Sequence, residues 1–263
     1  LPYLNIDSID FCTFGNSKPF RIKVRNVLND NYTYFYVKKA DSSRIYGLEL
    51  EHLLSPNHII FLVHEDTLIE EHISGIPGDI FIENYLDTCS DQDKRGLAKE
   101  FVKFNERCFV RLLGDMRSYN YVIVLTHDFD RIQYRIRAMD FDQQSFEGNP
   151  KVYKPQFLKE NNKLVAMTAK LLREESVDQY VKEERSLLAK RATNSKKRLN
   201  NLLDCMRNDT ISTPEKVEEL KLGLLDLTGD INFKKSKNMG DILNSALEFI
   251  IRNYKNINPY IIK

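Results

Sequence analysis

The residues most suited to chemistry lie in the segment "LLGDMRSYNYVIV", from Leu112 to Val124, and in "MDFD" shortly after it. Asp115 and Asn120 stand five residues apart, directly before a run of β-forming residues, and Asp140 follows about twenty residues later. Carboxylate and amide oxygens are the hard ligands that magnesium prefers in proteins. A carboxylate beside a hydroxyl can also accept its proton. These residue types could form a loop that handles phosphate groups, but the spacing alone is a weak signal because loops are rich in both residues, so the surrounding elements decide.

The elements before this segment predict a small, strand-rich part over residues 1–73. Alternating apolar and polar residues favour strands, and the turn "NDN" joins two of them into a hairpin. Leucines and isoleucine at helical spacing, a capping serine and a proline stop predict one helix among the strands. The expected order is three strands, the helix and a second hairpin, in "IDFCTF", "FRIKVRNVL", "YTYFYVKK", "SSRIYGLELEHLLSP", "HIIFLV" and "TLIEEHI".

The elements after residue 73 predict a larger, mainly helical part. "SGIPG" interrupts the pattern and is expected to act as a hinge. A helix over residues 91–113 precedes the Asp115 segment, a hairpin of "YVIVLT" and "RIQYRIRAM" follows it, and long amphipathic stretches fill the chain from Pro155 onward. "STPEKVEELKLGLLDLTG" has a capping-box pattern of Ser212 and Glu215. We therefore expect an α+β fold in three parts, residues 1–73, 74–150 and 151–263.

In this order, the hinge "LIEEHISGIPG", the segment "LLGDMRSYN" and the motif "MDFD" resemble the protein-kinase-like fold. Within that fold the chain looks most like the aminoglycoside/choline/fructosamine phosphotransferase branch, from Phe14 to about Gly148. The resemblance implies a bilobal fold with a small antiparallel β-sheet lobe, one helix in that lobe, and a larger helical lobe that carries a catalytic hairpin. It also implies ATP and Mg²⁺ as cofactors. The reaction would move the γ-phosphoryl group of ATP to a hydroxyl of a small molecule.

The resemblance assigns the catalytic and metal roles by position. Phosphoryl transfer has a loose transition state, so the protein mainly positions groups and neutralises charge. Asp115 would accept the proton of the acceptor hydroxyl, and Asn120 and Asp140 would hold magnesium. Arg117 would contact the transferred phosphate, since a guanidinium can hold two phosphate oxygens. A salt bridge that steadies the loop is the alternative for Arg117.

The resemblance also assigns the nucleotide contacts. Lys38 would neutralise the α- and β-phosphates and would be held by an ion pair with Glu49, with Lys39 and Glu51 as the alternatives. The backbone of the hinge residues would meet the adenine edge. A turn before the second strand would cover the phosphates through backbone N–H groups and a hydroxyl. The hinge residues are Glu71, His72 and Ile73, and the covering turn is Gly15, Asn16 and Ser17.

Two alternative hypotheses assign the same fold a different function. Leu113 stands where the family usually has histidine, and the covering turn has one glycine. These departures suggest a catalytically inactive, nucleotide-binding or scaffold homologue. A Ser/Thr protein kinase acting on its own basic segment is the other reading. "HDFD", at residues 127–130, also matches the metal-binding DxD of glycosyltransferases, but a solvated turn between two strands accounts for it better.

Composition limits the partners. The chain has 263 residues, 42% of them hydrophobic, which is enough for a sizeable core. Residues 1–150 contain 17 basic and 23 acidic residues, whereas residues 151–263 contain 22 and 15. The basic second half favours a neutral or anionic small-molecule acceptor, or a protein. No motif for specific nucleic-acid binding, no signal peptide and no membrane-spanning run is found. Four dispersed cysteines favour the reducing cytoplasm over a disulfide framework.

Overall fold

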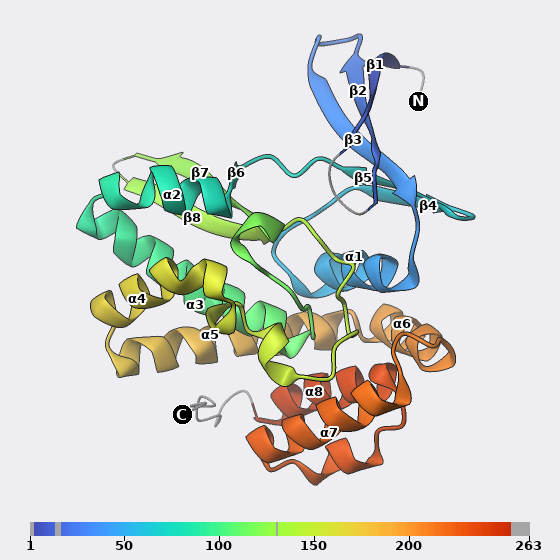
Figure 1. Cartoon of the computed structure of the whole chain (residues 1–263), viewed down its shortest axis with the longest axis vertical. Coiled ribbons are helices and arrows are strands. Elements are labelled where there is room, and N and C mark those ends of the chain that lie inside the picture. Colours follow the sequence, from blue (N-terminus) through green and yellow to red (C-terminus); the bar gives the residue numbers. More distant parts are fainter. Residues whose placement is uncertain (1–2, 14–16, 130, 254–263) are drawn as a thin grey trace.

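A computed structural model describes residues 3–13, 17–129 and 131–253. The protein is α+β, with a small antiparallel sheet near the N-terminus and a larger helical part (Figure 1). The sheet has five strands in the order β1-β2-β3-β5-β4. Their bounds are β1 Leu4–Phe11, β2 Phe20–Asn26, β3 Tyr32–Lys39, β4 Phe61–His64 and β5 Thr67–Glu71. The five-stranded sheet thus lies entirely within residues 1–73.

Both predicted hairpins of this sheet are confirmed. β2 pairs with β3 and β4 pairs with β5, all antiparallel. The first strand was expected at residues 9–14 but covers Leu4–Phe11, and it pairs with β2 through a register shift between Ile6 and Ser8. β3 pairs with β5 so that Lys38 lies opposite Leu68. This register brings residues 38 and 70 to the same face of the sheet, as diagonal neighbours.

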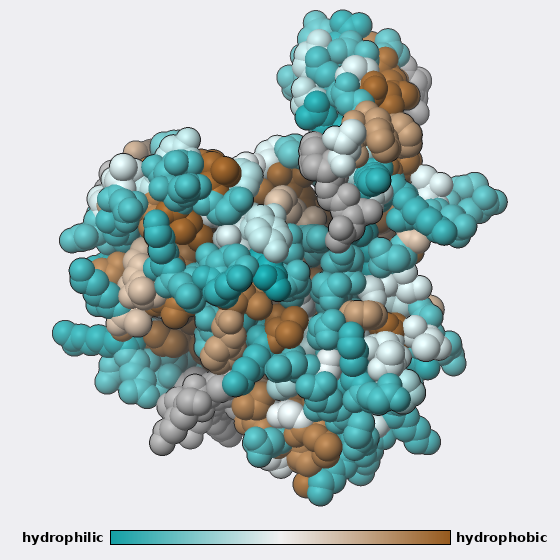
Figure 2. Space-filling view, viewed as in Figure 1, coloured by the Kyte–Doolittle hydropathy of each residue, from teal (hydrophilic) through white to brown (hydrophobic). Residues whose placement is uncertain are grey.

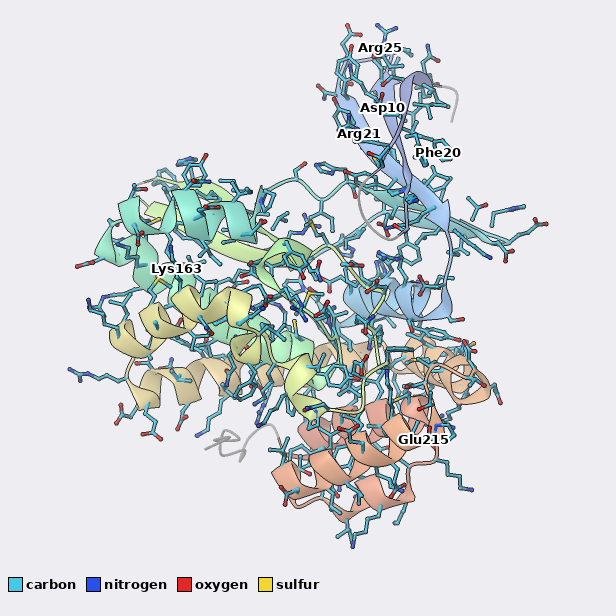
Figure 3. All side chains as sticks on the ribbon, in the orientation of Figure 1. Asp10, Phe20, Arg21, Arg25, Lys163 and Glu215 are labelled. Carbon is cyan, nitrogen blue, oxygen red and sulfur yellow. The ribbon has the colours of Figure 1, made fainter. Side chains whose placement is uncertain are left out.

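The outer end of the sheet projects away from the rest of the molecule (Figure 1). Alternate residues of β1 and β2 give it one apolar and one charged face. The apolar face includes Ile6, Ile9 and Phe11, which are exposed, and Figure 2 shows brown surface along one side of this projection. On the charged face Arg21 lies 3.1 Å from Asp10, and both are labelled in Figure 3.

Helix α1, Ser42–Leu54, lies between the sheet and the helical part (Figure 1). The predicted helix is confirmed, but its N-cap is Asp41 and not a serine, because the Asp41 carboxylate accepts a hydrogen bond from Arg44 N at 2.8 Å. Glu51 on α1 is buried and forms an ion pair with the buried Arg111 at the end of α3. α1 is therefore fixed to the helical part as well as to the sheet.

A second, three-stranded sheet and two helices follow the hinge. The bounds are β6 Ile76–Pro77, α2 Gly78–Asn84, α3 Asp91–Val110, β7 Tyr121–Asp128 and β8 Arg131–Ala138. The predicted helix and the predicted β7–β8 hairpin are confirmed. Ile76 and Pro77, expected as a hinge, also form a short edge strand against β7.

The C-terminal part is helical, as predicted, with different boundaries. The helices are α4 Asn162–Leu171, α5 Glu174–Asn194, α6 Lys196–Asn208, α7 Pro214–Thr228 and α8 Met239–Asn253. The amphipathic stretch 177–206 is broken at Ser195 into α5 and α6. The cap of α7 is Thr213, because Ser212 donates its hydroxyl hydrogen bond to Phe146 O instead. Gly229 ends α7 with a φ of 67°, as its position predicts.

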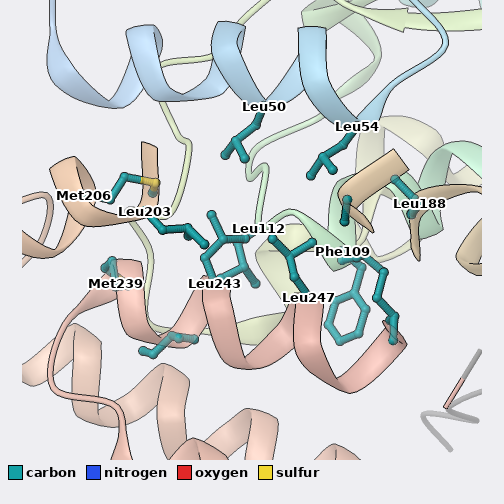
Figure 4. Packing of buried hydrophobic residues seen from close by; sticks show 14 of the residues in the cluster. Leu50, Leu54, Phe109, Leu112, Leu188, Leu203, Met206, Met239, Leu243 and Leu247 are labelled. Carbon is teal, nitrogen blue, oxygen red and sulfur yellow. The ribbon is translucent and has the colours of Figure 1, made fainter. Parts of the chain in front are cut away.

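Helices α1, α3, α5, α6 and α8 share one hydrophobic core. Leu50 and Leu54 of α1 meet Leu203 of α6 and Leu243 of α8 (Figure 4). A second core lies between α2, α3 and the β7–β8 hairpin, and Leu48 of α1 belongs to it. Among the described residues, no helix is both long and apolar enough to cross a bilayer.

Candidate functional site

A cleft of about 590 Å³ opens between the five-stranded sheet, α1 and the end of β8. Seven of the residues that the sequence nominated for a site line this cleft, although they come from segments as far apart as residues 17 and 140. These seven are Ser17, Lys38, Glu71, His72, Ile73, Asn120 and Asp140. Asp115 and Arg117 lie beside Asn120 but outside the lining, and Glu49 lies elsewhere.

Asp115 is held in a constrained loop. Its backbone has a φ of 55°, in the left-handed region that non-glycine residues seldom adopt, although aspartate tolerates it better than most. Asp115 N donates to Val152 O at 3.3 Å, and the Asn120 amide donates to Asp115 O at 2.8 Å. Its carboxylate remains about one-third exposed. The loop therefore presents a fixed, accessible carboxylate next to the cleft.

Arg117 forms the salt bridges that sequence analysis gave as its alternative role. Its Nε lies 2.7 Å from Asp115 Oδ1 and its Nη1 lies 2.9 Å from Glu160 Oε1. The hydrogen bond to Asp115 is the main reason why the pKa of Arg117 is raised. Arg117 thus orients the Asp115 carboxylate, and it would have to change partners to hold a phosphate.

Asn120 and Asp140 both line the cleft, and their oxygens are of the type that magnesium prefers. The Asn120 side-chain nitrogen is engaged with Asp115, so its amide oxygen is the group left to act as a ligand. Among the described residues, no cluster of three His, Cys, Asp or Glu side chains could hold a metal by itself. The donor set fits a magnesium ion that takes its remaining ligands from phosphate oxygens and water.

Arg44 of α1 competes for the same carboxylate. Its Nη2 lies 2.7 Å from Asp140 Oδ1 and 3.8 Å from Asp142 Oδ2, and the Arg44 side chain is 6% exposed. Burial opposes the charge of Arg44, yet the carboxylates of Asp140 and Glu70 raise its pKa. A metal at Asp140 must therefore share this carboxylate with Arg44 or displace it.

The expected ion pair between Lys38 and Glu49 is wrong. Lys38 pairs with Glu70 on β5, and both side chains are buried. Glu49 points to the opposite side of α1, where its carboxylate lies 2.6 Å from Arg198 of α6. The alternative Glu51 pairs with Arg111 in the core. The β3–β5 register explains this outcome, since it brings Lys38 beside Glu70 across the two strands.

Two of the three hinge N–H groups already donate hydrogen bonds to neighbouring backbone carbonyls. Glu71 N donates to Ile60 O and His72 N donates to Tyr34 O, each at 2.8 Å. These two N–H groups are therefore not available to an adenine, contrary to the expectation for them. Within the part of the chain that the structure describes, Ile73 N makes no backbone hydrogen bond. Ile73 is thus the hinge residue best able to donate to a ligand in the cleft.

Of the turn expected to cover the phosphates, the structure describes Ser17. Ser17 is exposed and lines the cleft. Gly15 and Asn16 lie outside the described residues.

Acidic side chains outnumber basic ones in the cleft. Lys38 and Arg44 face five carboxylates, which belong to Asp41, Glu70, Glu71, Asp140 and Asp142. Burial and the neighbouring Asp140 carboxylate raise the pKa of Asp142 to about 6. Such a cleft repels a bare polyphosphate and suits one that arrives with a divalent cation.

Sequence analysis missed Arg44 and Glu70, and each had a signal. Arg44 lies four residues before the buried Leu48 and so falls on the buried face of α1. Glu70 alternates with the buried Leu68 on β5, which places it on the inner face of the strand. A charge at a core position of an amphipathic pattern was therefore the clue.

Comparison with known proteins adds no relative: no family model matches this chain, and no curated protein does either.

Proposed function

We propose that this protein is a magnesium- and ATP-dependent phosphotransferase of the kinase-like fold, which moves the γ-phosphoryl group to a hydroxyl of a small molecule. The observation that carries the proposal is the meeting of Asn120 and Asp140 with Lys38 and the hinge in one cleft. These residues come from separate elements, and each has the chemistry that its role requires. Asp140 and Asn120 would hold magnesium, whose charge would offset that of the phosphates when it is bound.

Each side chain has a part in this proposal. Asp140 and Asn120 hold the cation, and Lys38 offers an ammonium group to the phosphates. Asp115 accepts the proton of the acceptor hydroxyl, and Arg117 keeps the Asp115 carboxylate in place through its 2.7 Å contact. The excess of carboxylates in the cleft supports a metal-bound nucleotide over a free one.

A pair of conservative variants tests this division of roles. Asp115→Asn should bind Mg-ATP as well as the wild type and lose turnover. Asp140→Asn should lose magnesium-dependent binding as well as turnover. Binding is measured by calorimetry with and without magnesium, and turnover by ATP consumption across a panel of hydroxyl compounds. Asp87→Asn changes an exposed carboxylate that does not line the cleft, and it is the matched control. Full turnover in Asp115→Asn would show that Asp115 is not the proton acceptor.

A catalytically inactive nucleotide-binding protein is the second candidate, and a specific observation favours it. Lys38 is paired with Glu70, and Asp140 is paired with Arg44. Each group that Mg-ATP would need is therefore already neutralised by a neighbouring side chain. This candidate predicts magnesium-dependent ATP binding without turnover on any acceptor. The same calorimetry and ATP-consumption measurements on the wild type separate the two candidates.

A further inference from the structure

A second cavity, of about 360 Å³, lies between α3, α4, α5 and the segment 154–156. It shares no lining residue with the cleft between the five-stranded sheet, α1 and the end of β8. Its walls are mostly apolar and include Phe101, Val165, Leu172 and Val181. Its volume is at the small end of the roughly 300–1,000 Å³ range of ligand pockets.

Lys154 brings a buried positive charge to this cavity. Lys154 is only 3% exposed, and its ammonium lies 4.5 Å from the centre of the Phe109 ring. Within the described chain no carboxylate comes within ion-pair distance of Lys154. The nearby Glu106 is bound to Arg185 Nε at 2.7 Å. Burial lowers the pKa of Lys154 by more than the nearby Glu106 carboxylate raises it.

Two other polar side chains of the cavity, Asn105 and Thr168, differ in their partners. The Asn105 amide donates to Phe101 O and accepts from Gln156 N, each at 2.8 Å. Thr168 Oγ1 is buried and has no hydrogen-bond partner in the described residues. The cavity therefore offers one buried ammonium and one buried hydroxyl, and its lining also includes the carboxylates of Glu106, which is paired with Arg185, and of Glu174 and Asp178. A buried hydroxyl without a partner is costly.

We propose that this cavity is a binding site for a small monocarboxylate with an apolar body. One ammonium balances one negative charge, and the Thr168 hydroxyl can donate to a carboxylate oxygen. A phosphate dianion would keep an uncompensated charge in this site, and the lining carboxylates of Glu174 and Asp178 would repel a dianion more strongly than a monoanion. The apolar body would cover the walls that α3, α4 and α5 provide.

The test compares an acid with its neutral counterpart. 3-Phenylpropionate is titrated into the full chain by calorimetry, alongside 3-phenylpropanol, which has the same body without the charge. The acid should bind, and the alcohol should bind at least about tenfold more weakly, equivalent to 1.4 kcal/mol. Lys154→Met should weaken the acid about tenfold or more. Lys163→Met, which removes an exposed lysine on α4 (Figure 3), should leave binding unchanged.

A second variant guards against loss of folding in Lys154→Met. Val165→Phe keeps the lysine and fills part of the cavity, so it should also weaken the acid while the protein still unfolds cooperatively. Thr168→Val should have a smaller effect in the same direction. The proposal is overturned if the acid does not bind, if acid and alcohol bind equally, or if neither Lys154→Met nor Val165→Phe changes the affinity.

Discussion

Arg44 Nη2 lies 2.7 Å from Asp140 Oδ1, so a buried arginine of α1 occupies the carboxylate that the proposed function assigns to magnesium. The same guanidinium reaches Glu70 and Asp142 at 3.9 Å and 3.8 Å. It also lies 3.6 Å from Asp41, so Arg44 is the shared counter-ion of four carboxylates in the cleft. A bound cation would have the same electrostatic effect on them, and the two are therefore in competition.

This competition predicts the behaviour of Arg44→Met. Removal of the guanidinium leaves four carboxylates without their shared counter-ion, so the variant should lose about 1–3 kcal/mol of unfolding free energy without magnesium. Added Mg²⁺ should then raise the melting temperature of the variant more than that of the wild type. Arg198→Met, which removes an exposed partner of Glu49, serves as control. An equal response of Arg44→Met and the wild type to Mg²⁺ would contradict the competition.

The pairing of Lys38 predicts a specific energetic coupling. A double-mutant cycle of Lys38→Met and Glu70→Gln, measured by denaturant unfolding, should give an interaction energy of about 1–3 kcal/mol, because the pair is buried. The matched cycle of Lys38→Met with Glu49→Gln should give an energy near zero, since Glu49 contacts Arg198. Coupling to Glu49 and none to Glu70 would restore the pairing that the family resemblance implied.

The error over Lys38 shows what the sequence could and could not predict. The strands β2 to β5 and the helix α1 follow from local patterns, and these patterns are in the sequence. The partner of Lys38 depends on the register between β3 and β5, which no local pattern specifies. Glu49 and Glu51 stand two residues apart and so point to different sides of α1, one toward α6 and one into the core.

The candidate site follows the same rule. Asp115, Asn120 and Asp140 were nominated by their types and spacing together with the order of the hinge, hairpin and "MDFD" motif that carries the family resemblance. Their shared surroundings, above all Arg44, depend on how α1 packs against the end of β8. The break at Ser195 was likewise hidden, since the apolar periodicity continues across it while the chain turns.

Asp142 predicts a dependence of stability on pH. Its pKa rises from an ordinary value of 3.8 to about 6 in the folded protein, because burial and Asp140 disfavour its charge. The folded state therefore holds this proton more tightly than the unfolded state does. The contribution of Asp142 to stability is greatest below about pH 4 and is lost as pH rises to about 6.

Asp142→Asn removes that titration. The variant should gain stability relative to the wild type as pH rises from about 4 to 6, with the difference constant at higher pH. Thermal unfolding of both proteins between about pH 4 and 6 measures this difference in stability. Asp87→Asn, at an exposed site, is the control and should show no such trend. A difference between Asp142→Asn and the wild type that does not change with pH would show that Asp142 titrates normally.

Gly47 predicts how closely α1 must approach the cleft. A glycine inside a helix normally costs about 1 kcal/mol relative to alanine. Here a Cβ at position 47 would lie 2.8 Å from Phe141 Cβ and 3.2 Å from Phe141 O, and Phe141 is itself buried between Asp140 and Asp142. Gly47→Ala should therefore destabilise the protein by about 1–3 kcal/mol, because overlap in a packed core outweighs the gain in helix propensity. It should also weaken magnesium-dependent nucleotide binding by displacing Asp140.

Gly96 of α3 provides the matched comparison. A Cβ at position 96 would meet only Tyr134 Cδ2, at 3.7 Å, which is ordinary van der Waals contact. Gly96→Ala should therefore stabilise the protein by about 0.5–1 kcal/mol, as helix propensity alone predicts. If α1 packs against Phe141, denaturant unfolding should show a lower unfolding free energy for Gly47→Ala and a higher one for Gly96→Ala, each relative to the wild type. Stabilisation by both substitutions would mean that α1 stands further from the cleft, and the contact between Arg44 and Asp140 would then be lost as well.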